Sequence, residues 1–196
     1  MKSRLEGAAI EQLFGGARTV NRFIDRPVSD ATLLELYELL KWGPTAVNSQ
    51  PGRYVFIRSR VEKERLLPAL AGGNVEKTLR SPVTVIVAAD KRFFDHLPDQ
   101  FKGFDAKPMY EAAPELTRET ALRNSSMQGA YLIMAARALG LDCGPMSGFD
   151  AAKVDAAFFP RGEWASNFLV NLGYGDSQFN FQRGPRLEFD TVARLL

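Results

Sequence analysis

Val83-Thr-Val-Ile-Val-Ala-Ala89 is the stretch of this sequence that decides its fold. β-Branched residues dominate it, and such residues fit a pleated strand. Apart from Thr84 the run holds no polar side chain, so it lacks the alternation of a strand with one wet face. A run of this kind is typical of a strand that is covered on both faces. We therefore expect a central strand here, with helices packed on each side of it.

Helical and extended patterns follow one another on both sides of this strand. Apolar residues at i, i+3, i+4 and i+7 after Ser29 or Asp30 predict a helix that ends near Trp42 and Gly43. Further helices are expected at 61–70, 75–79, 114–139 and 150–158, strands at 53–58 and 166–174, and a short element at 142–146. This order indicates an α+β fold with one sheet and a thick helical layer.

The helix at 114–139 is the longest expected element. Apolar residues recur there at helical spacing, and its second half is apolar nearly all round, so we expect a buried central helix. Gly140 is the expected glycine at its C-terminal end. The stripe consists of Met127, Ala130, Tyr131, Met134 and Ala138.

Length and composition limit the possible classes of protein. A chain of 196 residues suits a single domain over 1–196, with 45% apolar and 24% charged residues. The net charge of +2 gives no argument for a nucleic-acid partner. No stretch has the length and apolarity of a signal peptide or membrane span, so we expect no membrane association and a cytoplasmic protein.

Cysteine and histidine are nearly absent. The single cysteine, Cys143, excludes an internal disulfide and fits a reducing compartment. The single histidine, His96, argues against a histidine-based metal site and against a Ser-His-Asp triad, so we expect no metal. If the chain is an enzyme, an organic cofactor is therefore expected to carry the reaction.

Trp42-Gly-Pro-Thr-Ala-Val-Asn-Ser-Gln-Pro51 joins the first helix to the first strand. Its two prolines restrict the backbone, and Thr45, Asn48 and Gln50 offer hydrogen-bond donors and acceptors. A flat heterocycle with carbonyls and ring nitrogens would suit such a loop. The segment fits an ordinary stiffened connection equally well, because most polar loops bind nothing.

Three other segments have the residue types of a binding site, although each one alone fits a structural explanation better. Arg18 and Thr19 combine a planar fork of donors with a hydroxyl, as a phosphate clamp does, yet exposed arginines are common. The glycines of 140–149 would let backbone approach a ligand, or would serve turns. Arg183 and Arg186 lie in a tail that would either fold back onto an anion or stay solvated.

Together, these segments resemble the nitroreductase family of FMN-dependent oxidoreductases, and the resemblance runs through most of the chain. A second set of segments is similar to the branch of that family that reduces malonic semialdehyde to 3-hydroxypropionate in pyrimidine degradation. The first set is Arg18-Thr-Val-Asn21, Pro44-Thr-Ala-Val-Asn-Ser-Gln-Pro51, Gly144-Pro-Met-Ser-Gly-Phe-Asp150 and Arg183-Gly-Pro-Arg186. The second set is Lys41-Trp-Gly-Pro-Thr45, Arg123-Asn-Ser-Ser-Met-Gln128, 144–150 and Asn171-Leu-Gly-Tyr-Gly-Asp176.

The resemblance implies a mixed, mostly antiparallel sheet flanked by helices and an intertwined homodimer, with FMN bound between the two subunits. The phosphate would be held by one chain, the flavin or ribityl would be contacted by the partner's loop, and a backbone N–H near Gly148 would face N5. No side chain is assigned as catalytic. The implied cofactor-binding residues are Arg18, Thr19, Asn21, Pro44, Thr45, Asn48, Gln50, Pro145, Met146, Ser147, Gly148, Arg183 and Arg186.

The chain departs from its relatives at three of the positions that would surround the cofactor. Many relatives have basic residues at the positions of Ala17 and Asn21, and an acidic one at that of Ser147. Fewer positive charges would stabilise reduced flavin less well, so we expect a lower reduction potential than in more basic relatives. Arg183 and Arg186 would compensate at the phosphate.

The implied activity is ping-pong hydride transfer from NADPH or NADH to a small molecule, with malonic semialdehyde as the expected acceptor. Nitroaromatics, quinones and enals are alternative acceptors, and a flavin carrier or sensor without turnover is an alternative from another class. No G-x-G-x-x-G fingerprint indicates a choice between NADH and NADPH. The aromatic stretch 90–114 fits either a substrate lid or packing between subunits.

Overall fold

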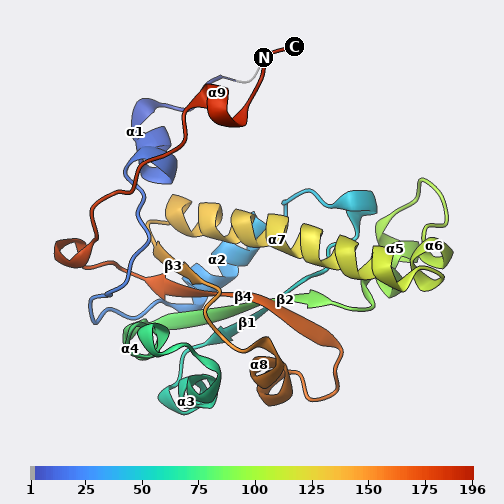
Figure 1. Ribbon diagram of the computed structural model, residues 1–196, viewed down its shortest axis with the longest axis horizontal. Coiled ribbons are helices and arrows are strands. Elements are labelled where there is room, and N and C mark those ends of the chain that lie inside the picture. The colour runs from blue at the N-terminus through green and yellow to red at the C-terminus, as the bar shows by residue number, and fades with distance from the viewer. Residues whose placement is uncertain (1–2) are drawn as a thin grey trace.

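The computed structural model describes residues 3–196, in which one four-stranded sheet lies between two layers of helices (Figure 1). The strand order is β1-β2-β4-β3, and each neighbouring pair is antiparallel. This agrees with the expected α+β fold and mostly antiparallel sheet. The strands are β1 (Gly52–Ile57), β2 (Val83–Asp90), β3 (Asp142–Met146) and β4 (Trp164–Gly173).

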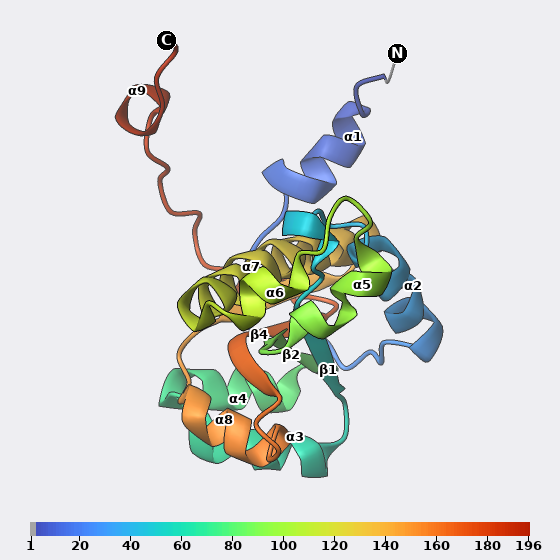
Figure 2. The same cartoon turned by 90° about the vertical axis from the view of Figure 1, so that its right-hand side faces the viewer.

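The two faces of the sheet are covered by different helices, as Figures 1 and 2 show. One face carries α2 (Asp30–Leu40) and α7 (Pro114–Ala138), and the other carries α3 (Arg60–Leu66), α4 (Gly72–Arg80) and α8 (Ala151–Phe158). Short helical turns complete the chain: α1 (Gly7–Ile10), η1 (Glu11–Gly15), η2 (Ala46–Asn48), η3 (Leu67–Ala69), η4 (Phe93–His96), α5 (Leu97–Gln100), α6 (Lys107–Glu111), η5 (Ser177–Phe179) and α9 (Phe189–Val192).

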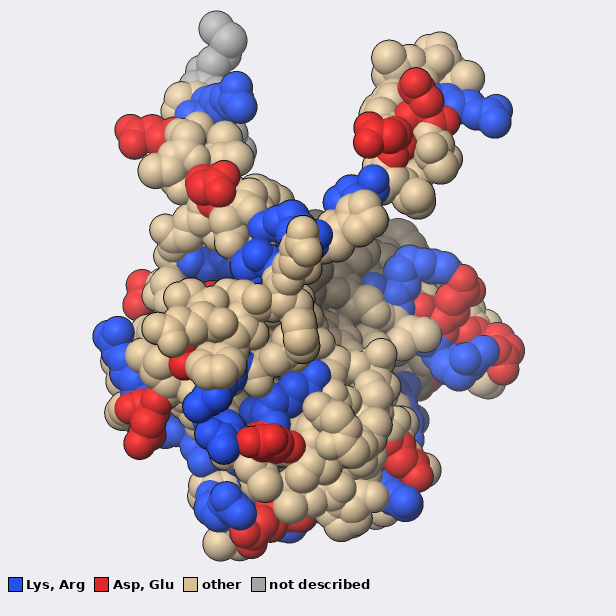
Figure 3. All heavy atoms as spheres, turned by 60° about the vertical axis from the view of Figure 1, so that its left-hand side comes forward, with Lys and Arg blue, Asp and Glu red and all other residues tan. Residues whose placement is uncertain are grey.

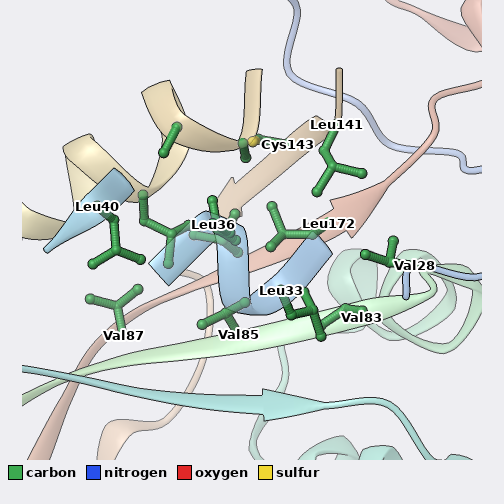
Figure 4. Packing of buried hydrophobic residues seen from close by; sticks show 14 residues of the cluster. Val28, Leu33, Leu36, Leu40, Val83, Val85, Val87, Leu141, Cys143 and Leu172 are labelled. Atoms are coloured by element: carbon green, nitrogen blue, oxygen red, sulfur yellow. The ribbon is translucent and has the colours of Figure 1, made fainter. Parts of the chain in front are cut away.

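β2 is the central strand that the sequence predicts. All eight of its residues are buried, and it pairs with β1 on one side and β4 on the other. Leu33, Leu36 and Leu40 of α2 point toward its Val85 and neighbouring valines (Figure 4). The N-cap of α2 is Ser29, whose hydroxyl accepts a hydrogen bond from the backbone N–H of Thr32 at 3.1 Å.

The prediction that the second half of α7 is buried all round is wrong for the single chain. Met127 and Tyr131, two members of the expected stripe, are 40% and 42% exposed. Apart from Leu132, the buried side of the helix carries small or polar residues, and an apolar face is left uncovered. The buried set on α7 is Thr117, Thr120, Ala121, Asn124, Ser125, Gln128, Gly129, Leu132, Ala135 and Ala136.

The aromatic stretch 90–114 forms a small core of its own beside α7. Phe93, Phe94 and Tyr110 are buried within the chain, and the Phe93 and Tyr110 rings meet edge to face at 4.9 Å between centroids. These three side chains are therefore not free to pack against a second subunit. Phe104, in contrast, is exposed.

The two chain ends project as arms from the same end of the body (Figure 2). Their apolar side chains have little to pack against, and Phe14, Phe181, Leu187 and Phe189 are exposed. Within residues 3–196, no helix combines the length and the apolarity that crossing a membrane requires.

Candidate functional site

The loop that enters β1 has a strained backbone. Val47, Asn48 and Gln50 all have positive φ angles, of 47°, 51° and 42°. A β-branched residue such as Val47 rarely adopts this left-handed conformation, because its side chain then crowds the backbone. The stiffness expected from the two prolines is therefore only part of the explanation, since the turn between them needs support from the rest of the fold.

Buried amides on α7 provide that support. The Asn124 side-chain oxygen accepts a hydrogen bond from the backbone N–H of Ala46 at 2.9 Å, and the Gln128 oxygen accepts one from Gly52 at 2.7 Å. Both amides are at most 4% exposed. Within the loop, the Thr45 hydroxyl accepts a hydrogen bond from the backbone N–H of Gln50 at 3.1 Å. Both ends of the turn are thus fixed to the long helix.

The free amides of this loop meet a residue that the sequence analysis did not single out, Gln100 of α5. Asn48 Nδ2 donates to the Gln100 carbonyl at 2.9 Å, and Gln50 Nε2 donates to the Gln100 side-chain oxygen at 2.9 Å. Asn48 and Pro44 are exposed. The loop consequently presents an ordered row of amides at the surface. Gln100 lies in the aromatic stretch, where no periodic pattern indicated its position.

The predicted basic residues come together in a cavity of about 560 Å³, hereafter the arginine pocket. The C-terminal segment folds back so that Arg183 and Arg186 join Arg18, Thr19 and Asn21 in its lining. No carboxylate lines the pocket, and within residues 3–196 none of its arginines forms an ion pair with a carboxylate. Figure 3 shows Lys and Arg side chains gathered at the base of the two arms.

Backbone carbonyls hold these guanidinium groups in place. Arg18 donates to the Phe181 carbonyl, and Arg183 donates to the carbonyls of Gly15 and, at 3.1 Å, Ala17. Each arginine therefore bridges the two ends of the chain. Neutral carbonyls leave the positive charge uncompensated, so the pocket is suited to an anion.

Arg137 is a fourth arginine of this pocket, and the sequence analysis did not single it out. It comes from the last turn of α7 and donates to the Leu13 carbonyl at 2.9 Å. Its Nε is buried and has no hydrogen-bond partner among the described residues. An arginine within an apolar helical run was the available signal, because a buried guanidinium needs a polar partner.

Gly144 makes room for the protein's own chain rather than for a ligand. A Cβ at this position would lie 2.5 Å from the backbone oxygen of Val20. The approach is close because Val20 N donates to the Cys143 carbonyl at 2.9 Å, which places Thr19 beside β3. Gly140, with a φ of 74°, is the left-handed residue after α7, as predicted.

The segment after β3 is fixed to α4. The Gly148 carbonyl accepts hydrogen bonds from Asn74 Nδ2 at 2.8 Å and from the Ala71 backbone at 2.9 Å. Ser147 and Gly148 are exposed and Pro145 is half-buried, whereas the Met146 side chain is buried in the core against Thr78. Of Met146, only the backbone is left to face a ligand.

Lys77 lies one turn after Asn74 on the same side of α4. It is half-buried, and burial lowers the pKa of its ammonium group. Both residues were missed by the sequence analysis. Asn74 lies before the helix expected at 75–79, and the two residues share a helix only because α4 begins earlier, at Gly72.

Within one chain, the 44–50 loop and the arginine pocket remain separate. Gln50 lines another cavity of about 710 Å³, together with Arg53, Tyr54 and Gln128. Among the described residues, none lines both this cavity and the arginine pocket. The structure therefore brings the predicted residues together in three clusters: the arginine pocket, the 145–148 segment and the loop.

Replacing Gly144 by alanine tests the close approach of Val20 to β3. We expect Gly144→Ala to lower the free energy of unfolding by about 1 to 3 kcal/mol, because a backbone oxygen cannot move aside as a side chain can. Gly72→Ala is the matched control, since a Cβ there meets nothing within 4 Å. Urea unfolding measures both variants, and equal stabilities would contradict the packing described.

Comparison with known proteins places this geometry in context. The family model described as the nitroreductase family matches residues 16–174. A Xanthomonas oryzae pv. oryzae protein, provisionally named NADH dehydrogenase/NAD(P)H nitroreductase, is 59% identical over 194 residues, covering 99% of each chain. A Stenotrophomonas maltophilia protein with the same provisional name is 56% identical over 195 residues, covering 100% of each chain.

Solved structures share the fold at low sequence identity. A Bacillus subtilis protein described provisionally as a nitroreductase has a TM-score of 0.88 at 23% identity, over 97% of this chain and 100% of that one. A similarly described Exiguobacterium sibiricum protein, solved in complex with FMN, has a TM-score of 0.84 at 20% identity, over 100% of each chain. The fold, the family model and the full-length relatives agree, and this chain belongs to the nitroreductase family.

Proposed function

We propose that this protein is a homodimeric, FMN-dependent NAD(P)H oxidoreductase. The observation that carries the proposal is the arginine pocket, in which four guanidinium groups converge and no carboxylate lines the wall. A phosphomonoester dianion is the part of FMN that such a pocket suits. Bound FMN supplies reversible two-electron chemistry, and the protein contributes positioning and charge.

The arginines of the pocket would hold the phosphate by exchanging hydrogen bonds to neutral backbone carbonyls for hydrogen bonds to charged phosphate oxygens. Arg18 and Arg183 donate to backbone carbonyls, and phosphate oxygens accept stronger hydrogen bonds from the same groups. The buried Nε of Arg137 lacks a partner among the described residues, which is the state expected of a donor kept for a ligand. Thr19 adds a neutral donor, and Arg186 adds a further cation.

The segment 145–148 and α4 would face the flavin. Ser147 and Gly148 are exposed, and Asn74 holds the Gly148 carbonyl and so fixes the path of the backbone. Lys77, half-buried on α4, would supply a positive charge near reduced flavin. Burial lowers the pKa of its ammonium group, and an electron-rich neighbour would favour the charged form. The lower reduction potential expected from Ala17 and Asn21, where many relatives are basic, stays a prediction.

A second subunit would complete the site. The amides of Asn48 and Gln50 lie at the surface, in a cluster separate from the arginine pocket of the same chain. The apolar face of α7 around Met127 and Tyr131 is uncovered, and Trp42 beside the loop is 75% exposed. Burying this surface would stabilise a dimer in which one chain's loop meets the partner's arginine pocket.

Flavin binding tests the proposal directly. The purified protein should be yellow and should release FMN on denaturation, and Arg183→Gln should raise the Kd for FMN about tenfold or more, because it removes a charge-assisted hydrogen bond. Fluorescence titration measures the Kd. Arg161→Gln is the control, an exposed arginine whose 3.5 Å ion pair is with Glu163. A protein that stays colourless when FMN is added would refute the assignment.

Mixing two variants that bind FMN weakly tests whether both subunits contribute residues to each FMN site. Arg183→Gln should weaken the phosphate side of both sites, and Asn48→Ala with Gln50→Ala should weaken the amide side. In a mixed dimer one of the two sites has all of its native residues. Random co-refolding of equal amounts makes about half of the dimers mixed, so the mixture should recover about a quarter of the wild-type FMN capacity. If each chain builds its own site, mixing should recover none.

The substrate assignment is narrower and rests on the resemblance to malonic semialdehyde reductases. We expect kcat/KM for malonic semialdehyde to exceed that for a nitroaromatic, a quinone and an enal by about a hundredfold or more, with NADPH or NADH as the donor. Comparable values across the panel would indicate a broad-specificity reductase instead. Anaerobic mixing with NAD(P)H separates both from a carrier or sensor, whose flavin would stay yellow.

A further inference from the structure

Lys63 of α3 is a buried lysine. The residue is only 3% exposed, and its ammonium group donates to the Ser81 carbonyl and lies 3.4 Å from the Ser81 hydroxyl. Within residues 3–196 it takes part in no ion pair with an acidic side chain. A buried charge of this kind is costly unless an anion compensates it. Desolvation, with a smaller effect from Arg60, lowers its pKa to about 8.

A second basic cavity opens beside this lysine, hereafter the Lys63 pocket. Its volume is about 490 Å³, and it lies between the 24–28 segment, the start of α3 and the end of α4. Val28, Lys63 and Ser81 are its buried lining residues, and Asp25 is the only carboxylate among the described residues of the lining. None of its lining residues belongs to the arginine pocket. The lining arginines are Arg26, Arg58, Arg60 and Arg80.

The arginines of the Lys63 pocket are held only by weak interactions, so they are available to bind an anion. Arg60 pairs with Glu64 at 2.8 Å and Arg80 with Glu76 at 2.9 Å, and Arg58 pairs with Asp30; all three pairs are exposed and therefore weak. These three acids lie outside the lining of the pocket. Arg26 stacks on the Tyr174 ring at 3.8 Å from its centroid and has no ion pair among the described residues.

Ser81, which lines the Lys63 pocket, belongs to a buried network of polar side chains. The Ser81 hydroxyl lies 3.1 Å from that of Thr84 and donates to Asn171 Oδ1 at 3.2 Å, and Asn171 is fully buried. Asn171 Nδ2 in turn donates to the Thr78 hydroxyl at 3.5 Å. These contacts hold Ser81, and through it Lys63, in one position. A fixed donor set binds an anion at a lower entropic cost than free side chains do.

We propose that the Lys63 pocket is a second anion site, which binds a phosphate group at the ammonium of Lys63 and the surrounding arginines. A tetrahedral dianion offers several acceptor oxygens to donors that converge from three chain segments. It would also supply the missing counter-charge of the buried lysine. The phosphate would come either from the free ion or from a nucleotide that carries a phosphomonoester.

Titration of the FMN-saturated protein with inorganic phosphate tests this site, because FMN then occupies the arginine pocket. Calorimetry at constant ionic strength should show saturable binding that Lys63→Met weakens about tenfold or more. Arg161→Gln, at an exposed arginine outside the Lys63 pocket, should bind phosphate as the wild type does. Undiminished binding by Lys63→Met would overturn the proposal, as would binding that never saturates.

Two further measurements guard against a misfolded variant and a misplaced ligand. NMR of ¹³C-labelled lysine should show the pKa of Lys63 rising from about 8 when phosphate is added, since an anion favours the charged form; an unchanged pKa would contradict the site. Arg26→Gln with Arg80→Gln, both at exposed residues, should also weaken binding. An undiminished phosphate affinity in this double variant would likewise overturn the proposed site.

The source of the phosphate and the role of FMN are tested separately. 2′,5′-ADP that binds more tightly than inorganic phosphate would identify a nucleotide, and equal affinities would identify the free ion. Repeating the phosphate titration on Arg183→Gln without FMN shows whether the Lys63 pocket binds independently of the proposed cofactor. Loss of phosphate binding in that variant would place the ion in the arginine pocket and overturn the inference.

Discussion

The attachment of the 45–52 loop to α7 is the constraint on which the candidate site depends. Left-handed backbone at Val47, Asn48 and Gln50 is unfavourable in isolation. Two buried amides of α7, Asn124 and Gln128, compensate by accepting backbone hydrogen bonds at both ends of the turn. Because an unmet buried acceptor is costly, the helix and the loop stabilise each other's conformation. The exposed amides then have a fixed direction.

The arginine pocket depends on a different constraint, which is the crossing of the two chain ends. Arg183 reaches carbonyls near residue 15, and Arg18 reaches a carbonyl near residue 181. The approach of Val20 to Gly144 sets the position of the first of these segments against β3. The pocket is thus built from segments far apart in the sequence, and its cations are collected by the fold rather than by a local motif.

Patterns within single segments were predictable from the sequence, and contacts between segments were not. The burial of Val83–Ala89 and the cap at Ser29 follow from local residue types. The outward face of α7 around Met127 was assigned wrongly, because periodicity shows that a stripe exists and does not show what covers it. Arg137, Asn74 and Gln100 were missed, since their hydrogen-bond partners lie 52 to 124 residues away in the sequence.

Net charge was a poor guide to the anion chemistry of this chain. A total of +2 suggests an electrically neutral molecule, yet four arginines share a pocket without a carboxylate in its lining. The acids lie elsewhere, and many form exposed pairs within one helix, such as Glu64 with Arg60 and Glu76 with Arg80. The charges of such a pair cancel in the net charge of the chain, and the pair contributes little to stability. The distribution of unpaired cations, rather than their total, therefore determines which anions this fold attracts.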